Sequence, residues 1–309
     1  MIKIFYPALV FLIFFRAFNI CAVELPPQFR VYKISFKGVA SVSRGELAKT
    51  LITQTPPAWK FWQARPVIAQ SDINDDLLRI KQFYRDHGYY HSQAVVETRK
   101  ISGAESADQE QPSSADMKKR DYENDAPDFR LPMYEVIFIV DEGAPVLIGS
   151  VDIKLKPDIT ASDLREPLTD LLNLKQGQIF VLADYQEAKQ VLQKSLGNRG
   201  NPKAIIKGRV FVNTRDNTAD IVFEIDPGPL CVFGEVSVSG NDGYVNDVIM
   251  DRAITVKEGK EYITAEIEET QRNLYNLDVF RMTLIKPGDL DHENKSIPIR
   301  IEVSPRKRQ

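Results

Sequence analysis

The sequence has few of the residues that build disulfide frameworks, metal sites and catalytic centres. It contains 2 cysteines, Cys21 and Cys231, and 3 histidines. Two cysteines exclude a disulfide framework and a zinc site with cysteine ligands. His87 is expected at a helix end, His91 at the start of a strand and His292 in a polar turn, and none has the ligand spacing of a metal site. Neither a glycine-rich phosphate loop nor a nucleophile elbow occurs. We therefore expect no enzymatic activity, no catalytic residue, no cofactor and no bound metal.

The chain also lacks an excess of positive charge. Lys and Arg number 40 against 43 Asp and Glu, which gives a formal net charge of −3. Proteins that bind nucleic acid through phosphate contacts gather Lys and Arg on one face. We therefore expect no nucleic-acid partner.

Only one long apolar run is present, and it lies at the N-terminus. Residues 4–15 follow Lys3 and are almost entirely apolar, but the run is too short to span a bilayer comfortably. With Ile20-Cys-Ala22 as a cleavage site, residues 1–22 have the features of a secretory signal peptide. Retention of the run as a membrane anchor is the alternative. If residues 1–22 are removed, Cys231 is a lone thiol, and we expect it to be buried and free.

The sequence does contain an internal repeat. The 14-residue stretches that begin at Val140 and Ile225 resemble each other, and Gly234 lies 85 residues after Gly149. A constant period of this length indicates that one supersecondary unit has been duplicated in tandem. Such an array is typical of binding proteins. Gly149 and Gly234 both lie inside strands with period-2 patterns, where a glycine marks a bulge or a close backbone approach.

The third repeat shows the order of its elements clearly: strand, helix, helix, strand, strand. Valines alternate with other residues over 232–238, and apolar residues then recur at helical spacing from Val245 to Ala253. Thr264 is expected to cap a second helix, and two strands follow at 280–286 and 297–303. The last strand alternates apolar and polar residues, which predicts one face covered by helices and one face open to solvent.

The other two repeats follow the same order. In the second, we predict strands at 151–155, 203–212 and 219–226, with helices at 160–174 and 182–192. In the first, we predict strands at 32–36, 89–98 and 133–141, one helix after Ser43 and another at 73–84. Residues 102–132 are rich in Ser, Ala, Asp, Glu and Gln, which predicts a disordered insertion between two strands.

These repeats resemble the polypeptide-transport-associated (POTRA) domain family. Phe83-Tyr-Arg-Asp-His-Gly-Tyr-Tyr-His-Ser-Gln-Ala-Val-Val96 resembles that family's second-helix end, glycine turn and following strand. The other matching motifs are a first strand ending in glycine, an inter-helix turn and a helix exit, at 32–38, 236–240, 258–262 and 274–280. The resemblance spans nearly all of residues 28–304. It implies an α+β fold: a tandem array of three β-α-α-β-β domains, each a three-stranded mixed sheet covered by two helices.

The repeat and the resemblance together predict the domain boundaries. We expect a signal peptide at 1–22, POTRA-like domains at 23–142, 143–227 and 228–305, and a basic tail at 306–309. The disordered insertion at 102–132 belongs to the first of these domains.

The resemblance is closest to the periplasmic part of the barrel subunit of the translocation and assembly module. It implies a periplasmic, outer-membrane-associated scaffold that binds unfolded outer-membrane proteins and works with an inner-membrane-spanning assembly partner. In that family a C-terminal β-barrel follows, whereas this sequence ends at 305–309. We therefore expect either a barrel on another chain or a truncated product. The alternative is an inner-membrane-anchored POTRA interaction protein of the cell-division or septation kind.

Two kinds of segment are candidates for client binding. The resemblance places the second strand of each sheet at an edge, where a client can add a strand with little sequence preference. These strands lie at 91–98, 204–212 and 281–286; in the second, the candidate residues are Ile205, Ile206, Val210, Phe211 and Val212. The other candidate is the loop between Pro56 and Pro66, where Trp59, Phe61 and Trp62 either anchor a partner or fold over the core of the first repeat.

Overall fold

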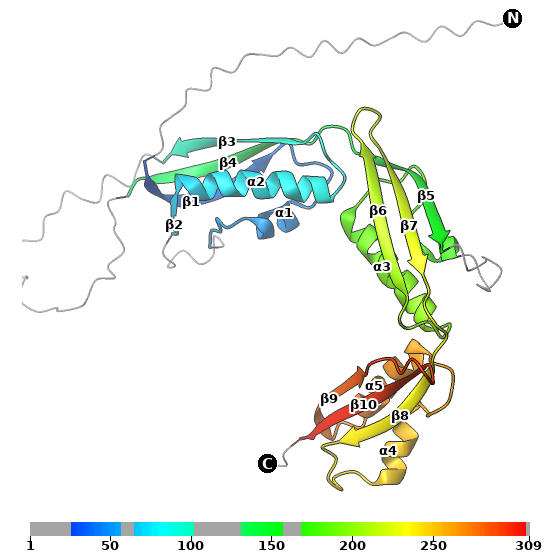
Figure 1. Cartoon of the computed structure of the whole chain (residues 1–309). Coiled ribbons are helices and arrows are strands. Elements are labelled where there is room, and N and C mark those ends of the chain that lie inside the picture. Colours follow the sequence, from blue (N-terminus) through cyan, green and yellow to red (C-terminus); the bar gives the residue numbers. More distant parts are fainter. Residues whose placement is uncertain (1–25, 57–64, 102–130, 157–167, 307–309) are drawn as a thin grey trace, which may run out of the picture. The chain divides into compact units, whose positions relative to one another are not determined.

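The computed structural model describes residues 26–56, 65–101, 131–156 and 168–306 (Figure 1). The predicted signal peptide, residues 102–130 of the predicted insertion, and Trp59, Phe61 and Trp62 lie outside these described residues. The chain divides into two compact units. One contains most of the first sheet, and the other contains the second and third sheets together with residues 38–41 and 80–94.

The first sheet has one strand more than predicted. Its strands are β1 (Gln28–Lys37), β2 (Val67–Ala69), β3 (Gln93–Lys100) and β4 (Met133–Asp141), in the order β2-β1-β4-β3. β1 runs parallel to β4 and antiparallel to the short β2. The helices are α1 (Arg44–Thr50) and α2 (Gln70–Asp86). The Ser43 hydroxyl accepts a hydrogen bond from the Glu46 amide, which confirms the predicted start of α1.

A buried carboxylate of α2 secures the segment that follows α1. The Asp76 side chain has no exposed surface. Its two oxygens accept hydrogen bonds from the amides of Ile52, at 2.7 Å, and Thr53, at 3.1 Å. Because a buried charge is costly unless it is hydrogen-bonded, these two bonds explain why an acidic residue is tolerated on the inner side of this helix.

The second sheet comprises β5 (Leu147–Leu155), β6 (Ile205–Asn213) and β7 (Thr218–Asp226), in the order β5-β7-β6. β5 is parallel and β6 antiparallel to the central β7. The helix α3 (Leu182–Gly197) packs on one face, and its Leu192 is buried with Phe223 of β7 in one core. Of the helix predicted at 160–174, residues 160–167 lie outside the described residues. Residues 168–174 form a 3-10 turn at Leu168–Leu171 and irregular chain, so an α-helix over this part is wrong.

The third sheet repeats this topology. β8 (Val232–Ser239), β9 (Phe280–Pro287) and β10 (Ser296–Pro305) lie in the order β8-β10-β9, with β8 parallel and β9 antiparallel to β10. The helices α4 (Asp247–Ala253) and α5 (Thr264–Asn276) complete the repeat. Buried Phe233, Leu274 and Ile301 belong to its core. Cys231 is buried and free, as predicted.

The two period-marking glycines coincide with irregularities in their sheets. The β5–β7 register shifts between Ile148 and Ser150, on either side of Gly149. In the β8–β10 pair, Phe233 and Val236 are three residues apart, but their partners Ile297 and Ile299 are only two apart. β8 therefore has one extra residue in the stretch that contains Gly234. The predicted bulges are therefore confirmed.

The start of α5 differs from the prediction. Thr264 is its first helical residue, and the N-cap is Ile263, whose side chain makes no capping hydrogen bond. Instead, the Asn198 side-chain oxygen, at the end of α3, accepts a hydrogen bond from the Ala265 amide at 2.9 Å. The ammonium group of Lys194 also contacts the Glu268 carboxylate at 2.7 Å. A helix of the second repeat thus supplies the cap for a helix of the third.

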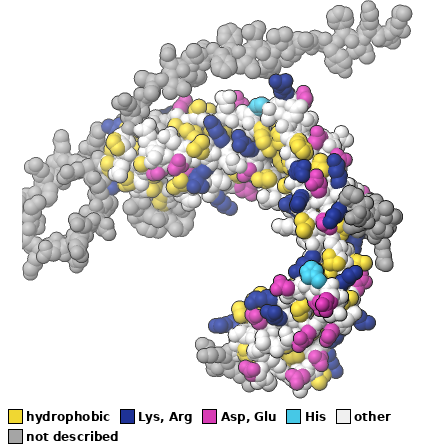
Figure 2. Space-filling model, viewed as in Figure 1, with side chains coloured by type: hydrophobic (Ala, Val, Ile, Leu, Met, Phe, Trp, Pro, Cys, Tyr) yellow, Lys and Arg dark blue, Asp and Glu magenta, His cyan; other side chains and the backbone are white. Residues whose placement is uncertain are grey.

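The surface of the molecule carries both signs of charge. Figure 2 shows Lys and Arg side chains interspersed with Asp and Glu over the visible face. Within the described ranges, no helix combines the length and the apolar character that a bilayer crossing requires.

Candidate functional site: the edge strands

All three candidate strands lie at sheet edges. The strand orders place β3, β6 and β9 each at the end of a sheet, with a hydrogen-bonded neighbour on one side. This location is as predicted. An edge strand presents backbone N–H and C=O groups that its own sheet does not use. What these groups can bind depends on which residues point them outward and on what lies beside them.

The hydrogen bonds of the central strand β7 identify the outward residues of β6. The Ile225 carbonyl accepts from the Lys156 amide, and the Asn217 carbonyl accepts from the Leu147 amide, so odd-numbered residues of β7 face β5. Successive residues of a strand point their backbone groups to opposite sides. The even-numbered residues of β7 therefore face β6, where they pair with its odd-numbered residues. The outward backbone groups of β6 belong to Ile206, Gly208, Val210 and Val212. We call this row the open edge of β6.

This geometry divides the five candidate residues into two sets. Ile206, Val210 and Val212 present free backbone groups, and their side chains pack partly buried against the core on the helix side. Ile205 and Phe211 use their backbone groups to bind β7, and their side chains are 55% and 57% exposed on the opposite, open face of the sheet. Gly208, which was not among the candidates, belongs to the open edge.

The edge of the third sheet is obstructed. The Pro298 carbonyl accepts a hydrogen bond from the Gly288 amide, so the even-numbered residues of β10 point their backbone groups at β9. They pair with even-numbered residues of β9. The outward residues of β9 are therefore Thr283, Ile285 and Pro287. Pro287 has no N–H to donate. The Thr283 carbonyl already accepts a hydrogen bond from the Gln271 side chain of α5, at 3.0 Å. Among the described residues, no side chain makes such a bond to the open edge of β6.

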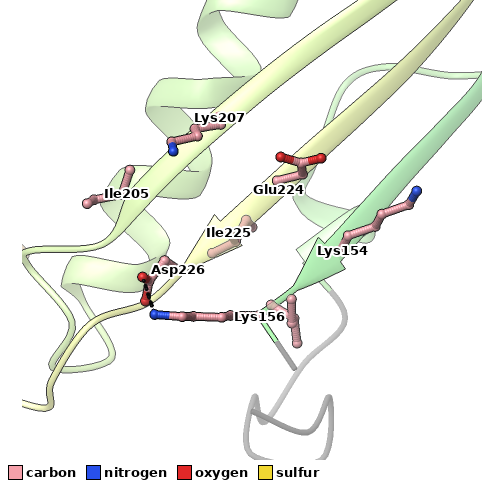
Figure 3. A pocket seen from close by; sticks show the side chains of 8 residues that line it. Lys154, Lys156, Ile205, Lys207, Glu224, Ile225 and Asp226 are labelled. Atoms are coloured by element: carbon pink, nitrogen blue, oxygen red, sulfur yellow. Dashed lines mark hydrogen bonds and ion pairs between the residues drawn. The ribbon is translucent and has the colours of Figure 1, made fainter. Parts of the chain in front are cut away.

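Beside the open edge, the open face of the second sheet contains a shallow hollow of about 350 Å³. Its labelled side chains come from three neighbouring strands, and the Lys156 amino group points at the Asp226 carboxylate, 3.0 Å away (Figure 3). Hydrogen bonds from Lys156 and from the Gly228 amide hold the pKa of the Asp226 carboxyl below its usual value. Lys207 of β6 lies at the rim of this hollow and gives the open face positive charge next to the open edge.

The comparisons with known proteins agree with this topology. Residues 147–228 match the family model described as POTRA, surface antigen variable number repeat. The crystal structure of BamA POTRA3-5 from Haemophilus influenzae is similar at 18% identity and a TM-score of 0.53, covering 91% of this chain and 99% of that one. The fold is that of tandem POTRA domains. The matched residues include all of β5, β6 and β7, so the open edge lies within the matched POTRA domain.

Two other structures align with lower TM-scores. BamA from Haemophilus ducreyi lacking POTRA domains 1-3 is 20% identical, with 52% of this chain and 29% of that chain covered and a TM-score of 0.45. POTRA1-3 of the periplasmic domain of Omp85 from Anabaena is 15% identical, with 91% and 97% covered and a TM-score of 0.31.

One of the residues that the sequence analysis missed, Gly208, has a recognisable signal in the sequence. A glycine inside an alternating strand signals a close approach by another group, and Gly208 interrupts the apolar pattern of β6 in this way. The approaching group is Tyr185 of α3, whose hydroxyl lies where a Cβ at Gly208 would be. The glycine does not reveal which group approaches it, and the bond from Gln271 to Thr283 has no local sequence signal, because both depend on how a helix lies over its sheet.

Proposed function

We propose that this chain is a periplasmic, outer-membrane-associated POTRA scaffold. It captures extended segments of unfolded outer-membrane proteins or of assembly partners by adding them as a strand to β6. It acts in outer-membrane protein assembly or secretion and performs no catalysis. The scaffold consists of the POTRA domains at 23–142, 143–227 and 228–305.

The observation that carries the proposal is the open edge of β6. Ile206, Gly208, Val210 and Val212 present backbone donors and acceptors in a row, and no proline interrupts it. An extended peptide that pairs there gains main-chain hydrogen bonds whatever its sequence. This suits a receptor of many unfolded clients. The exposed side chains of Ile205 and Phe211 add apolar surface on the open face of the same strand.

The test is a proline at an outward N–H. Val210→Pro removes one donor from the open edge and leaves the bonds to β7 in place, because the Val210 amide points away from β7. Binding of a labelled peptide from an outer-membrane β-strand should weaken at least about tenfold, as expected when an added strand loses a donor and meets a proline ring. Fluorescence anisotropy measures the affinity, and far-UV circular dichroism should stay unchanged.

Two matched variants control this experiment. Thr283→Pro makes the same change at an outward position of β9 and should leave peptide binding intact. Phe211→Pro removes a donor that binds β7, so it should lower the free energy of unfolding by more than about 1 kcal/mol. Unaltered peptide affinity in folded Val210→Pro protein would exclude the open edge of β6 as the binding site.

A further inference from the structure

One side chain of α3 reaches across the sheet to the open edge of β6. The Tyr185 ring stacks on Phe223 of β7, with centroids 5.5 Å apart and an interplanar angle of 14°. Phe223 pairs in register with Gly208. A Cβ at position 208 would overlap the Tyr185 hydroxyl oxygen, so the glycine makes room for it. The ring therefore lies over the centre of the sheet and the hydroxyl over its last strand.

The Tyr185 hydroxyl has no hydrogen-bond partner among the described residues. Partial burial raises the pKa of Tyr185, so the hydroxyl remains a protonated donor at neutral pH. The third repeat has no such group. α3 and α5 begin 82 residues apart, which aligns Tyr185 with Ile267. The matching pairs Val151–Ile221 and Val236–Ile299 align the two sheets, so Phe223 of β7 corresponds to Ile301 of β10. Gly208 pairs with Phe223 and Ile285 pairs with Ile301, so Ile285 is the residue of β9 that corresponds to Gly208.

We propose that the Tyr185 hydroxyl recognises the strand that adds to β6, by hydrogen bonding to a short polar side chain opposite Gly208. This inference rests on the proposed function. Residues opposite each other in paired strands have their Cβ atoms about 4.5–5.5 Å apart. A hydroxyl above Gly208 therefore lies within reach of a Ser, Thr or Asn side chain on the helix side of the incoming strand. An apolar residue there would cover the hydroxyl without satisfying it, which is unfavourable.

The neighbours of Gly208 define the rest of the preferred strand. Ile206 and Val210 flank it on the helix side and are partly buried in the core, so the incoming residues opposite them should be apolar. On the open face, Lys207 and Arg209 alternate with these positions. Arg209 already contacts the Glu224 carboxylate at 3.1 Å, but its guanidinium carries five N–H donors and can bind a second carboxylate. Both side chains therefore favour acidic residues between the apolar ones. The preferred ligand is an extended amphipathic segment of the form apolar, acidic, hydroxyl or amide, acidic, apolar.

Two peptides that differ at one position test this inference. Both are as long as β6, nine residues, with Val-Glu-Thr-Glu-Val or Val-Glu-Val-Glu-Val at the centre. The pattern is symmetric, so it reads the same in parallel and antiparallel pairing. Isothermal titration calorimetry on the full chain should show about two- to tenfold tighter binding of the Thr peptide, the range that a net hydrogen bond supplies.

Variants at the site decide the outcome. Tyr185→Phe keeps the stacked ring and should abolish the preference by weakening only the Thr peptide. Gly208→Ala should do the same by displacing the hydroxyl. If Val210→Pro weakens both peptides but the preference is absent, or persists in Tyr185→Phe, the Tyr185 inference is wrong and the proposed function stands. If neither peptide binds the wild-type chain, or Val210→Pro has no effect on either, the proposed function and this inference both fail.

Discussion

The second and third repeats share one topology but differ at their edge strands. In the third, Pro287 removes a donor from the outward row of β9, and the aligned residue of β6 is Val210, which keeps its donor. Gln271 occupies the outward carbonyl of Thr283. The residue of α3 that aligns with Gln271 is Lys189, which makes no such bond in the described structure.

If β6 accepts a strand as proposed, only a few residues separate its edge from the obstructed edge of β9. Exposed edges pair with other chains unless they are blocked, and proline is one of the usual blocks. The third repeat uses a proline and a side-chain amide, while the second leaves its row open and places Gly208 and Tyr185 beside it. The shared fold therefore leaves the outward row of β6 open and that of β9 obstructed.

The bulge glycines provide the largest expected difference between the two repeats. A Cβ at Gly234 would lie 3.1 Å from the Pro298 nitrogen and 3.2 Å from the Ile297 carbonyl carbon, both backbone atoms that cannot rotate away. At Gly149 the nearest obstacle is the Asp220 side chain, which can move. Gly234→Ala should destabilise the third repeat by about 1–3 kcal/mol, and Gly149→Ala should cost the second repeat less.

Native-state hydrogen exchange measures these two effects repeat by repeat. Protection should fall in β8–β10 for Gly234→Ala and only slightly in β5–β7 for Gly149→Ala. An equal loss of protection in the two variants would show that both bulges tolerate a Cβ equally well, as expected from their equivalent positions in the repeat. A uniform loss across all three sheets would contradict a modular array.

Opening the guarded edge should have a smaller effect. The test starts from Val210→Pro, which should prevent strand addition to β6. In that variant, Gln271→Ala frees the Thr283 carbonyl as an acceptor, and Pro287→Val adds a backbone N–H donor to β9. Each restored hydrogen bond contributes about 0.5–1.5 kcal/mol, so weak binding of the strand peptide should return. Fluorescence anisotropy measures it, with Val210→Pro alone as the control. Continued absence of binding would mean that these two residues are not what guards β9.

The smallest expected effect is on the pH dependence of stability, and it comes from a set of hydrogen bonds to one carboxylate that the second repeat lacks. Glu142 of the first repeat accepts hydrogen bonds from the Ala40 amide at 2.9 Å and from the Tyr84 hydroxyl at 2.9 Å, whereas the residue 85 positions later is Pro227. Burial alone would raise the pKa of Glu142, but the hydrogen bonds from Ser41, Ala40 and Tyr84 outweigh it and lower the pKa.

Because the folded pKa of Glu142 lies below its unfolded value, its contribution to stability is present above the unfolded pKa. It is lost as the pH falls through the folded pKa. Urea unfolding at neutral pH should therefore find Glu142→Gln slightly less stable than the wild type, and the two should converge as the pH falls below the folded pKa of Glu142. A difference that persists at low pH would show that the ionised carboxylate is not the stabilising form.

The sequence was most informative where a signal is local or periodic. The spacing of Gly149 and Gly234 located both bulges. Strand alternation located β10, and the order of the repeat located β7, each to within a few residues. Edge position followed from the resemblance to a known fold. These features depend on residues that are neighbours along one strand or on the repeat itself.

Features that join separate elements could not be predicted in the same way. The Tyr185 hydroxyl meets Gly208 only because α3 crosses β6 at that point. The short β2 pairs with β1 across a segment that gave no strand signal of its own. Thr264 was expected to cap α5 because it is a good capping residue at the right place. The bond from Asn198 could be found only once the ends of two helices were seen together.

That last contact bears on the order in which the array is made. Domains generally fold in order from the N-terminus as a chain is made, so we expect the end of α3 to form before α5 is available. Starting a helix is its costly step. The side chain of Asn198 is then already in place to accept a hydrogen bond from the Ala265 amide, so the finished second repeat can act as the template on which the third begins.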